Sequence, residues 1–96
     1  MRVVYNEAAR QEGIDASVWY EESQQGLGIR FLIQWKDAET RMEIHPEIHR
    51  RFEGELRKCR FQAFPYTLVF RIRSEELQVI AVMHMSRRPR YWGGRA

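Results

Sequence analysis

The sequence has very little cysteine and no long apolar run. Its single cysteine, Cys59, cannot form an internal disulfide, which excludes a disulfide-stapled secreted scaffold and favours a reducing compartment. The longest apolar stretch, residues 77–85, is interrupted by Gln78 and His84, and the first 13 residues contain no apolar signal core. We therefore expect a cytoplasmic protein that does not enter a membrane.

The chain also lacks the ligand sets of common metal sites. His45 and His49 lie four residues apart, but the order H-P-E-I-H differs from the H-E-x-x-H of zinc hydrolases. Pro46 also interrupts the helix that would align the two rings. Cys59 lies in a strand-like alternation, which is typical of a packed and unreactive thiol. We expect neither a metal nor a cofactor.

The composition is that of a folded domain. Of the 96 residues, 44% are hydrophobic and 12% aromatic, which provides enough apolar surface to offset the entropy of ordering the chain. Chains of this length usually form a single core, and no repeat, low-complexity tract or linker divides the sequence. We expect one domain over residues 1–96.

Charge is divided unevenly along the chain. Residues 1–48 hold five basic and nine acidic side chains, a net charge of −4, whereas residues 49–96 hold eleven and four, a net charge of +7. Fourteen of the sixteen basic residues are Arg, which suits bidentate contacts with carboxylate or phosphate better than Lys does. The basic half also contains Tyr66, Phe70, Tyr91 and Trp92. This pattern favours a binding surface over a merely solvated face.

The first half of the chain predicts a short strand followed by two helices. β-forming residues 3–5 precede Asn6, a good N-cap, and the first helix is predicted from about Glu7 to Gln25, with Gly13 as its weak point. One apolar face of a second helix is formed by Leu27, Phe31, Trp35, Ala38 and Met42. This helix must stop at His45. The short connection predicts an antiparallel helix hairpin.

The second half changes to the period-two pattern of strands. After a charged connection, residues 45–54, strands are predicted over 56–63, 66–73 and 77–85, with a polar turn at 74–76. Residues 87–96 have no periodicity and are predicted to form a short tail, with at most one helical turn. The predicted fold is α+β, with the hairpin on one face of a mainly antiparallel sheet that contains a three-stranded meander. Alternation leaves Arg71 and Arg73 on the other face, which is the candidate working surface.

Six segments in this order resemble one family, the RelE/ParE superfamily of toxins from bacterial type II toxin-antitoxin modules. They are WYEE (19–22), GLGIRF (26–31), HPE (45–47), FPYTLVFRI (64–72), LQVIAVMH (77–84) and RRPRYW (87–92). The resemblance implies a small α+β toxin that a cognate antitoxin keeps silent, commonly by laying a helix or extended segment across its surface. The surface that the antitoxin would cover in this chain is not evident from the sequence.

The superfamily contains two mechanisms, and both stay open. RelE-like members cleave messenger RNA on the ribosome, whereas ParE-like members bind DNA gyrase and poison it. RNA-cleaving members typically carry an Arg where this chain has Tyr66, which favours the gyrase inhibitor. A basic and aromatic cluster at the C-terminus favours the nuclease. A third alternative is a degenerate member that only binds its antitoxin.

The cluster supplies the candidate site residues. His84 and Tyr91 are the candidates for proton transfer in a metal-independent ribonuclease, since a 2′-hydroxyl attack on phosphate needs an acid and a base. Candidates for contacts with phosphate or another target are Arg71, Arg73, Arg87, Arg88 and Arg90. Structural roles compete with these assignments. His84 can bond to backbone at a strand end, and an aromatic pair such as Tyr91 and Trp92 can fold back over the core.

Overall fold

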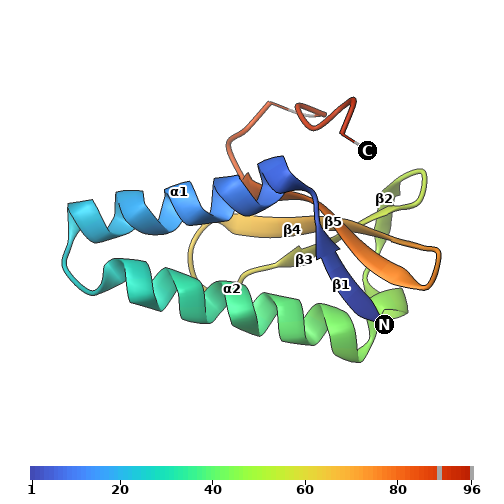
Figure 1. The fold of residues 1–96 in the computed structure, drawn as a ribbon, viewed down its shortest axis with the longest axis horizontal. Helices are drawn as coiled ribbons and strands as arrows, with labels where there is room; N and C mark the ends of the chain where they lie inside the picture. Colours follow the sequence, from blue (N-terminus) through green and yellow to red (C-terminus); the bar gives the residue numbers. More distant parts are fainter. Residues whose placement is uncertain (89, 96) are drawn as a thin grey trace.

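The computed structural model describes residues 1–88 and 90–95 and contains a helix hairpin and a five-stranded sheet (Figure 1). In chain order the elements are β1 (Arg2–Tyr5), α1 (Glu7–Ser23), α2 (Leu27–Ile44), a 3₁₀ turn (Pro46–Ile48), β2 (Arg51–Glu53), β3 (Leu56–Arg60), β4 (Tyr66–Arg73) and β5 (Glu76–His84). The predicted α+β fold is confirmed. Neither helix of the described residues is long and apolar enough to cross a membrane.

The sheet has the strand order β1-β5-β4-β3-β2. β1 lies parallel to β5, and every other neighbouring pair is antiparallel. Parallel neighbours need a long connection, and here the helix hairpin and strands β2 to β4 separate β1 from β5. The sheet is therefore mainly antiparallel, as predicted, with a single parallel edge pair.

The segment 45–54 was predicted only as a charged connection, and this was incomplete. It contains the 3₁₀ turn and β2, which pairs with β3 at the edge of the sheet. β2 is three residues long and mostly exposed, so it carries no alternating apolar pattern from which a strand could be predicted. The strand predicted over 56–63 ends earlier, at Arg60, because the chain turns before Pro65 with Phe64 at φ 73°.

Polar caps define the helix hairpin. Asn6 Oδ1 accepts a hydrogen bond from the Ala8 N–H at 2.9 Å, as expected of an N-cap. At the far end the Glu21 carboxylate accepts from the backbone N–H groups of Gly26 and Gly28, each at 3.0 Å. One side chain of α1 thus satisfies N–H groups at the start of α2 that would otherwise have no partner.

The predicted apolar stripe of α2 is confirmed as core. Its buried members Phe31, Trp35, Ala38 and Met42 belong to the same cluster as Leu68, Phe70 and Val79 of the sheet, and Leu27 is half-buried. A helix that places one apolar face on a sheet gains most of its stability from this burial. The hairpin therefore covers one face of the sheet, which we call the inner face.

The outer face of the sheet is not the open working surface that alternation predicts. A second cluster forms there from Val69, Ile80, Ala81 and Met83, and Trp92 of the C-terminal segment covers it with only 7% of its own surface exposed. Alternation considers only the strands, whereas the structural alternative for Tyr91 and Trp92, an aromatic pair folded back over the core, applies to Trp92. The tail covers the outer face, because its residue Trp92 folds back over the apolar cluster there.

Gly13 of α1 faces the side chain of Trp35 of α2. A Cβ at this position would overlap the indole ring of Trp35, which is buried against it. Gly13 is therefore a packing requirement of the hairpin, whereas its sequence position alone indicates only a weak point in the helix.

We expect Gly13→Ala to destabilise the protein by about 1–3 kcal/mol, because the added methyl group forces the indole out of its place. Helix propensity alone predicts the opposite sign, a gain of about 1 kcal/mol. Urea denaturation of both forms measures the difference. A gain in stability would contradict the close approach, and Ser23→Ala, at the exposed end of α1, is a control for helix propensity.

Candidate functional site

An open cavity lies where α1, the paired ends of β4 and β5, and the C-terminal segment meet. Its volume is about 340 Å³, and its lining combines acidic, aromatic and basic side chains: Glu12, Asp15, Ala16, Trp19, Tyr66, Val82, His84, Arg87 and Tyr91. The acidic residues come from α1 and the basic ones from the end of β5 and beyond. A ligand here would meet both signs of charge within one small space.

Strand register brings the first pair of site residues together. Tyr66 opens β4 and is paired with His84 at the end of β5, and their rings meet edge to face with centroids 5.1 Å apart. Tyr66 also packs against Tyr20 and Phe31, 6.4 and 5.0 Å away. Burial raises the pKa of the Tyr66 hydroxyl above its usual range. This side chain is part of an aromatic cluster and keeps its proton at neutral pH.

His84 is bonded to the backbone beside it. Its Nδ1 accepts a hydrogen bond from the Ser86 N–H at 3.0 Å and lies 2.8 Å from the Ser86 hydroxyl. In this arrangement the neutral ring carries its proton on Nε2. The ring is half-buried, so Nε2 is the nitrogen through which it could contact a ligand.

Tyr91 is held between two guanidinium groups. Arg87 lies over its ring at 4.3 Å from the centroid and Arg95 at 5.1 Å. Its hydroxyl is buried and forms no hydrogen bond of normal geometry with the part of the chain described here. Burial, together with the nearby Glu12 carboxylate, raises the pKa of Tyr91 well above its usual range. An enclosed hydroxyl that holds its proton this firmly is a poor acid or base.

Glu12 fixes the tail against the sheet. Its Oε1 accepts from the Val82 N–H at 3.1 Å and from Arg95 Nη1 at 2.9 Å, while its Oε2 accepts from Arg95 Nη2 at 3.1 Å. Arg95 also donates to the Ile80 carbonyl at 3.0 Å. Sequence reasoning missed Glu12 and Arg95, because their 83-residue separation leaves no local pattern.

The five candidate arginines are divided between two ends of the sheet. Arg71 lies 2.8 Å from Gln78 and 3.7 Å from Glu55, and Arg73 forms an ion pair with the same Glu55. Both lie toward the end of β4 that is remote from Tyr66, about 20 Å along the strand. The structure therefore does not bring Arg71 and Arg73 to the cavity.

The other three arginines follow β5. Arg87 lines the cavity, Arg88 is exposed beside it, and Arg90 forms an ion pair with Glu53 at 2.6 Å. Of the seven predicted site residues, the cavity thus contains His84, Arg87 and Tyr91. Arg88 adjoins this group in the chain, and Arg90 is engaged with β2.

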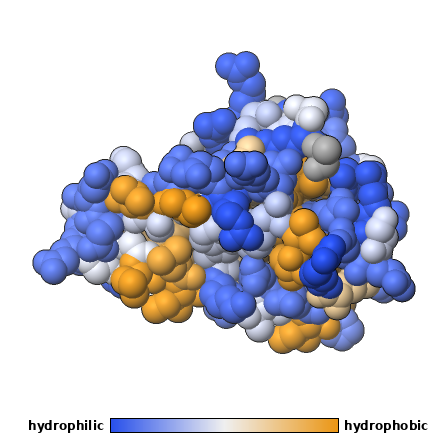
Figure 2. All heavy atoms as spheres, in the orientation of Figure 1, coloured by the Kyte–Doolittle hydropathy of each residue, from blue (hydrophilic) through white to orange (hydrophobic). Residues whose placement is uncertain are grey.

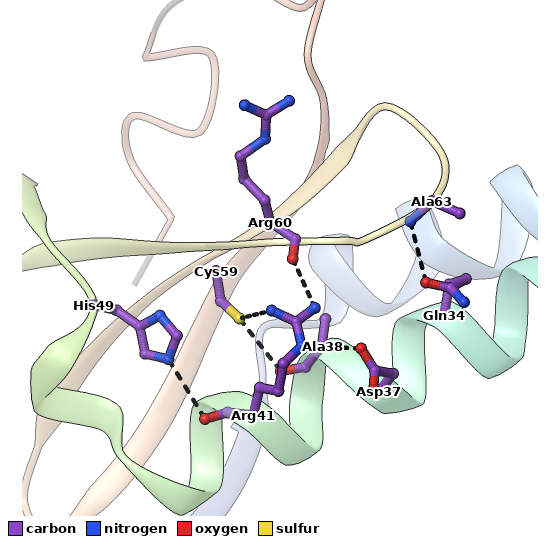
Figure 3. Close-up of polar contacts among 8 residues, drawn as sticks. All are labelled: Gln34, Asp37, Ala38, Arg41, His49, Cys59, Arg60 and Ala63. Atoms are coloured by element: carbon purple, nitrogen blue, oxygen red, sulfur yellow. Dashed lines mark hydrogen bonds and ion pairs between the residues drawn. The ribbon is translucent and has the colours of Figure 1, made fainter.

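Cys59 and His49, two of the residues considered above for metal binding or reactivity, have structural contacts (Figure 3). Cys59 is buried and donates to the Ala38 carbonyl at 3.4 Å, and burial raises the pKa of its thiol. His49 Nε2 lies 3.4 Å from the Arg41 carbonyl, while Arg41 donates to the Arg60 carbonyl at 2.7 Å. Within residues 1–88 and 90–95, no group of three or more His, Cys, Asp or Glu could hold a metal ion.

A family profile matches residues 3–89, and the family is described as the ParE toxin of the type II toxin-antitoxin system, parDE. The chain belongs to the ParE toxin family. This match confirms the predicted resemblance to the RelE/ParE superfamily and places the chain among its ParE members. A comparison with curated proteins finds no match.

The fold has a solved counterpart, titled "Chromosomal ParDE TA system from P. aeruginosa". The TM-score is 0.69 at 14% sequence identity, over 90% of this chain and 97% of the other. At this identity the likeness establishes the fold. Tyr91, Trp92 and Arg95 lie beyond the ParE match, which ends at residue 89, so the end of the chain, which lines the cavity through Tyr91, is outside the part matched to the family.

We expect the stability of this ParE-family chain to fall as pH rises above about 10, the ordinary pKa of tyrosine. A tyrosine whose pKa is raised by folding favours the folded state below its unfolded pKa, and this contribution is lost as pH rises toward the folded value. Tyr91→Phe removes one such group, so its stability should fall less steeply.

Urea denaturation of both proteins at about pH 8 and about pH 11 measures this difference in slope. Equal losses in the two proteins would show that Tyr91 ionises freely. Agreement of the two proteins near neutral pH is the control for an unaltered fold.

Proposed function

We propose that the chain is the toxin component of a type II toxin-antitoxin module, acting in the cytoplasm as a single domain over residues 1–96. In this proposal it inhibits growth by binding DNA gyrase and is neutralised by a cognate antitoxin. The observation that carries the proposal is the ParE match over residues 3–89. ParE-like members of the superfamily act on gyrase and RelE-like members on messenger RNA.

The chemistry of the cavity supports binding over RNA cleavage. Where RNA-cleaving relatives typically place an Arg, Tyr66 packs in an aromatic cluster and supplies no positive charge to a phosphate. The hydroxyl of Tyr91 is enclosed and keeps its proton. Of the two predicted proton-transfer residues only His84 is accessible, so a second group would have to be one of the cavity's carboxylates, Glu12 or Asp15.

The arginines at the end of β5 are the proposed target contacts. Arg87 and Arg88 are exposed and form no ion pair with the residues that the structure describes. Arg71 and Arg73 already bind Glu55, so we assign them a structural role at the other end of the sheet. Guanidinium groups without a partner can bind a carboxylate or phosphate of the target without first losing an existing pair.

Apolar side chains on the helix hairpin support a contact with the antitoxin. Figure 2 shows hydrophobic residues gathered over the turn end of the hairpin. The exposed members are Ile14, Val18, Trp19, Ile29, Leu32 and Ile33. A concentration of this kind is typical of a surface that a partner protein covers.

Induction of the toxin without its antitoxin tests the proposal. Messenger RNA integrity, DNA supercoiling and gyrase-linked DNA breaks are followed in one culture over the first minutes. A gyrase inhibitor leaves transcripts intact while breaks accumulate. Rapid cleavage of translated transcripts would instead establish the ribonuclease, and continued growth would leave only an antitoxin-binding member. His84→Gln should keep full toxicity in the first case and lose it in the second.

We expect the double substitution of Arg87 and Arg88 by Ala to abolish growth inhibition while the fold is kept, because exposed charges contribute little to stability. Growth after induction measures the first effect and thermal unfolding the second. The matched control is Arg71→Ala with Arg73→Ala, which removes two positive charges from β4. This variant should stay toxic. Undiminished toxicity of the Arg87 and Arg88 variant would exclude this surface as the target contact.

A further inference from the structure

A second hollow lies next to the cavity, on the outer side of the sheet. This groove has a volume of about 280 Å³ and is lined by Phe52, Lys58, Met83, Met85, Arg87 and Trp92. The ion pair between Glu53 and Arg90 also contributes to its lining. Arg87 belongs to both hollows, so the groove is continuous with the proposed target surface.

Some basic side chains form ion pairs within the described residues and others do not, both in the groove and elsewhere on the surface. Elsewhere the structure pairs many cations with carboxylates: Arg2, Lys36, Arg41, Arg71, Arg73 and Arg95, with Arg90 paired at the groove itself. Lys58 and Arg87 line the groove and form no ion pair within residues 1–88 and 90–95. A carboxylate placed here would neutralise charge that the described chain leaves uncompensated.

Two further cations without an ion pair in the described residues extend the groove. Arg60 follows Lys58 on the same side of β3, and its side chain extends away from α2, toward the outer side of the sheet (Figure 3). Arg88 follows Arg87 and is exposed. We call these four residues the basic border: Lys58 and Arg60 belong to β3 and Arg87 and Arg88 follow β5, with β4 between the two strands, so an anionic partner in the hollow would lie between the two pairs.

The floor of the groove is apolar and adaptable. Met83 lies in the outer cluster, and Met85 is 40% exposed. Thioether side chains adjust to aliphatic groups of different shape, which makes methionine frequent at surfaces that bind polypeptides. A partner with aliphatic side chains would bury this floor, which is otherwise left partly in contact with water.

The aromatic rings of the groove are already occupied, which argues against stacked bases. Lys58 Nζ lies over the Phe52 ring at 4.3 Å, and the edge-to-face contact between Phe52 and Trp92 spans 5.8 Å. Trp92 is buried, and Tyr91 is enclosed by Arg87 and Arg95. Single-stranded nucleic acid is bound largely by stacking on open aromatic faces. The groove therefore suits a polypeptide better than a nucleic acid.

We propose that this groove binds an acidic segment of the antitoxin, with carboxylates on the border of Lys58, Arg60, Arg87 and Arg88 and aliphatic side chains on Met83 and Met85. The identity of the partner rests on the proposed function. Because Arg87 is shared with the cavity, a segment seated in the groove takes this guanidinium away from the target. Neutralisation then follows from competition for one side chain.

A ten-residue peptide of alternating Glu and Leu is the probe for this inference. Titrated into purified toxin, it should shift the backbone amide resonances of Lys58 and Met85 and the indole resonance of Trp92. The double substitution Lys58→Glu and Arg60→Glu should weaken binding at least tenfold, since it reverses two charges on the border. Arg30→Glu with Arg50→Glu reverses two exposed charges elsewhere and should leave the affinity unchanged.

The toxin purified together with its antitoxin gives the second measurement. If the antitoxin fills the groove, the complex should not respond to the peptide. A full response from the complex would overturn the inference, as would the absence of any shift in the free toxin. Tighter binding of an oligothymidylate of equal length would also overturn it, and so would self-association of the toxin that produces the same shifts.

Thermal unfolding of both double variants establishes that they are folded. Met85→Asp adds a negative charge to the exposed floor. It should weaken binding of the peptide although the four residues of the basic border are unchanged. These measurements use purified protein, so they are independent of gyrase and of growth. If induction shows no effect on gyrase but the peptide binds, the proposed gyrase inhibition is wrong and the binding of an acidic segment in the groove is still supported. Failure of the peptide alone leaves gyrase inhibition intact.

Discussion

The carboxylate of Glu12 is the contact on which the arrangement around the site depends. It accepts from the Val82 N–H and from both terminal nitrogens of Arg95, so one side chain of α1 joins the helix, the sheet and the tail. With Arg95 held there, Trp92 lies on the outer face and Tyr91 between two guanidinium groups. Residues of this tail line both the cavity and the groove, and so both depend on the same half-buried ion pair.

Carboxylates decide which arginines are available to a partner. The chain is rich in Arg throughout its second half, yet Glu55 engages Arg71 and Arg73 and Glu53 engages Arg90. Arg87 has an aromatic ring beneath it instead of a carboxylate. A guanidinium on an aromatic face keeps its hydrogen-bond donors free at its edge, so it is held in place and still able to bind an anion.

Aromatic packing limits the chemistry that the cavity can perform. Tyr66 belongs to the cluster around Phe31, and the Tyr91 hydroxyl is enclosed, so neither is suited to carry a proton to a reacting phosphate. His84 Nδ1 accepts a hydrogen bond from the Ser86 N–H, which leaves only Nε2 for a ligand. The predicted pair of proton-transfer residues, His84 and Tyr91, is therefore not available as a pair, which supports the proposed binding role.

Local patterns were sufficient for the helix hairpin, the meander and the α2 stripe, because Phe31, Trp35 and Met42 recur with the period of a helix whatever surrounds them. The same patterns indicated a basic and aromatic C-terminus. Contacts between distant segments decided the rest: the β2 edge strand, the tail on the outer face, and the ion pairs that engage some arginines of the described residues and not others. Those contacts join residues up to 83 positions apart, and no short window of sequence contains both partners.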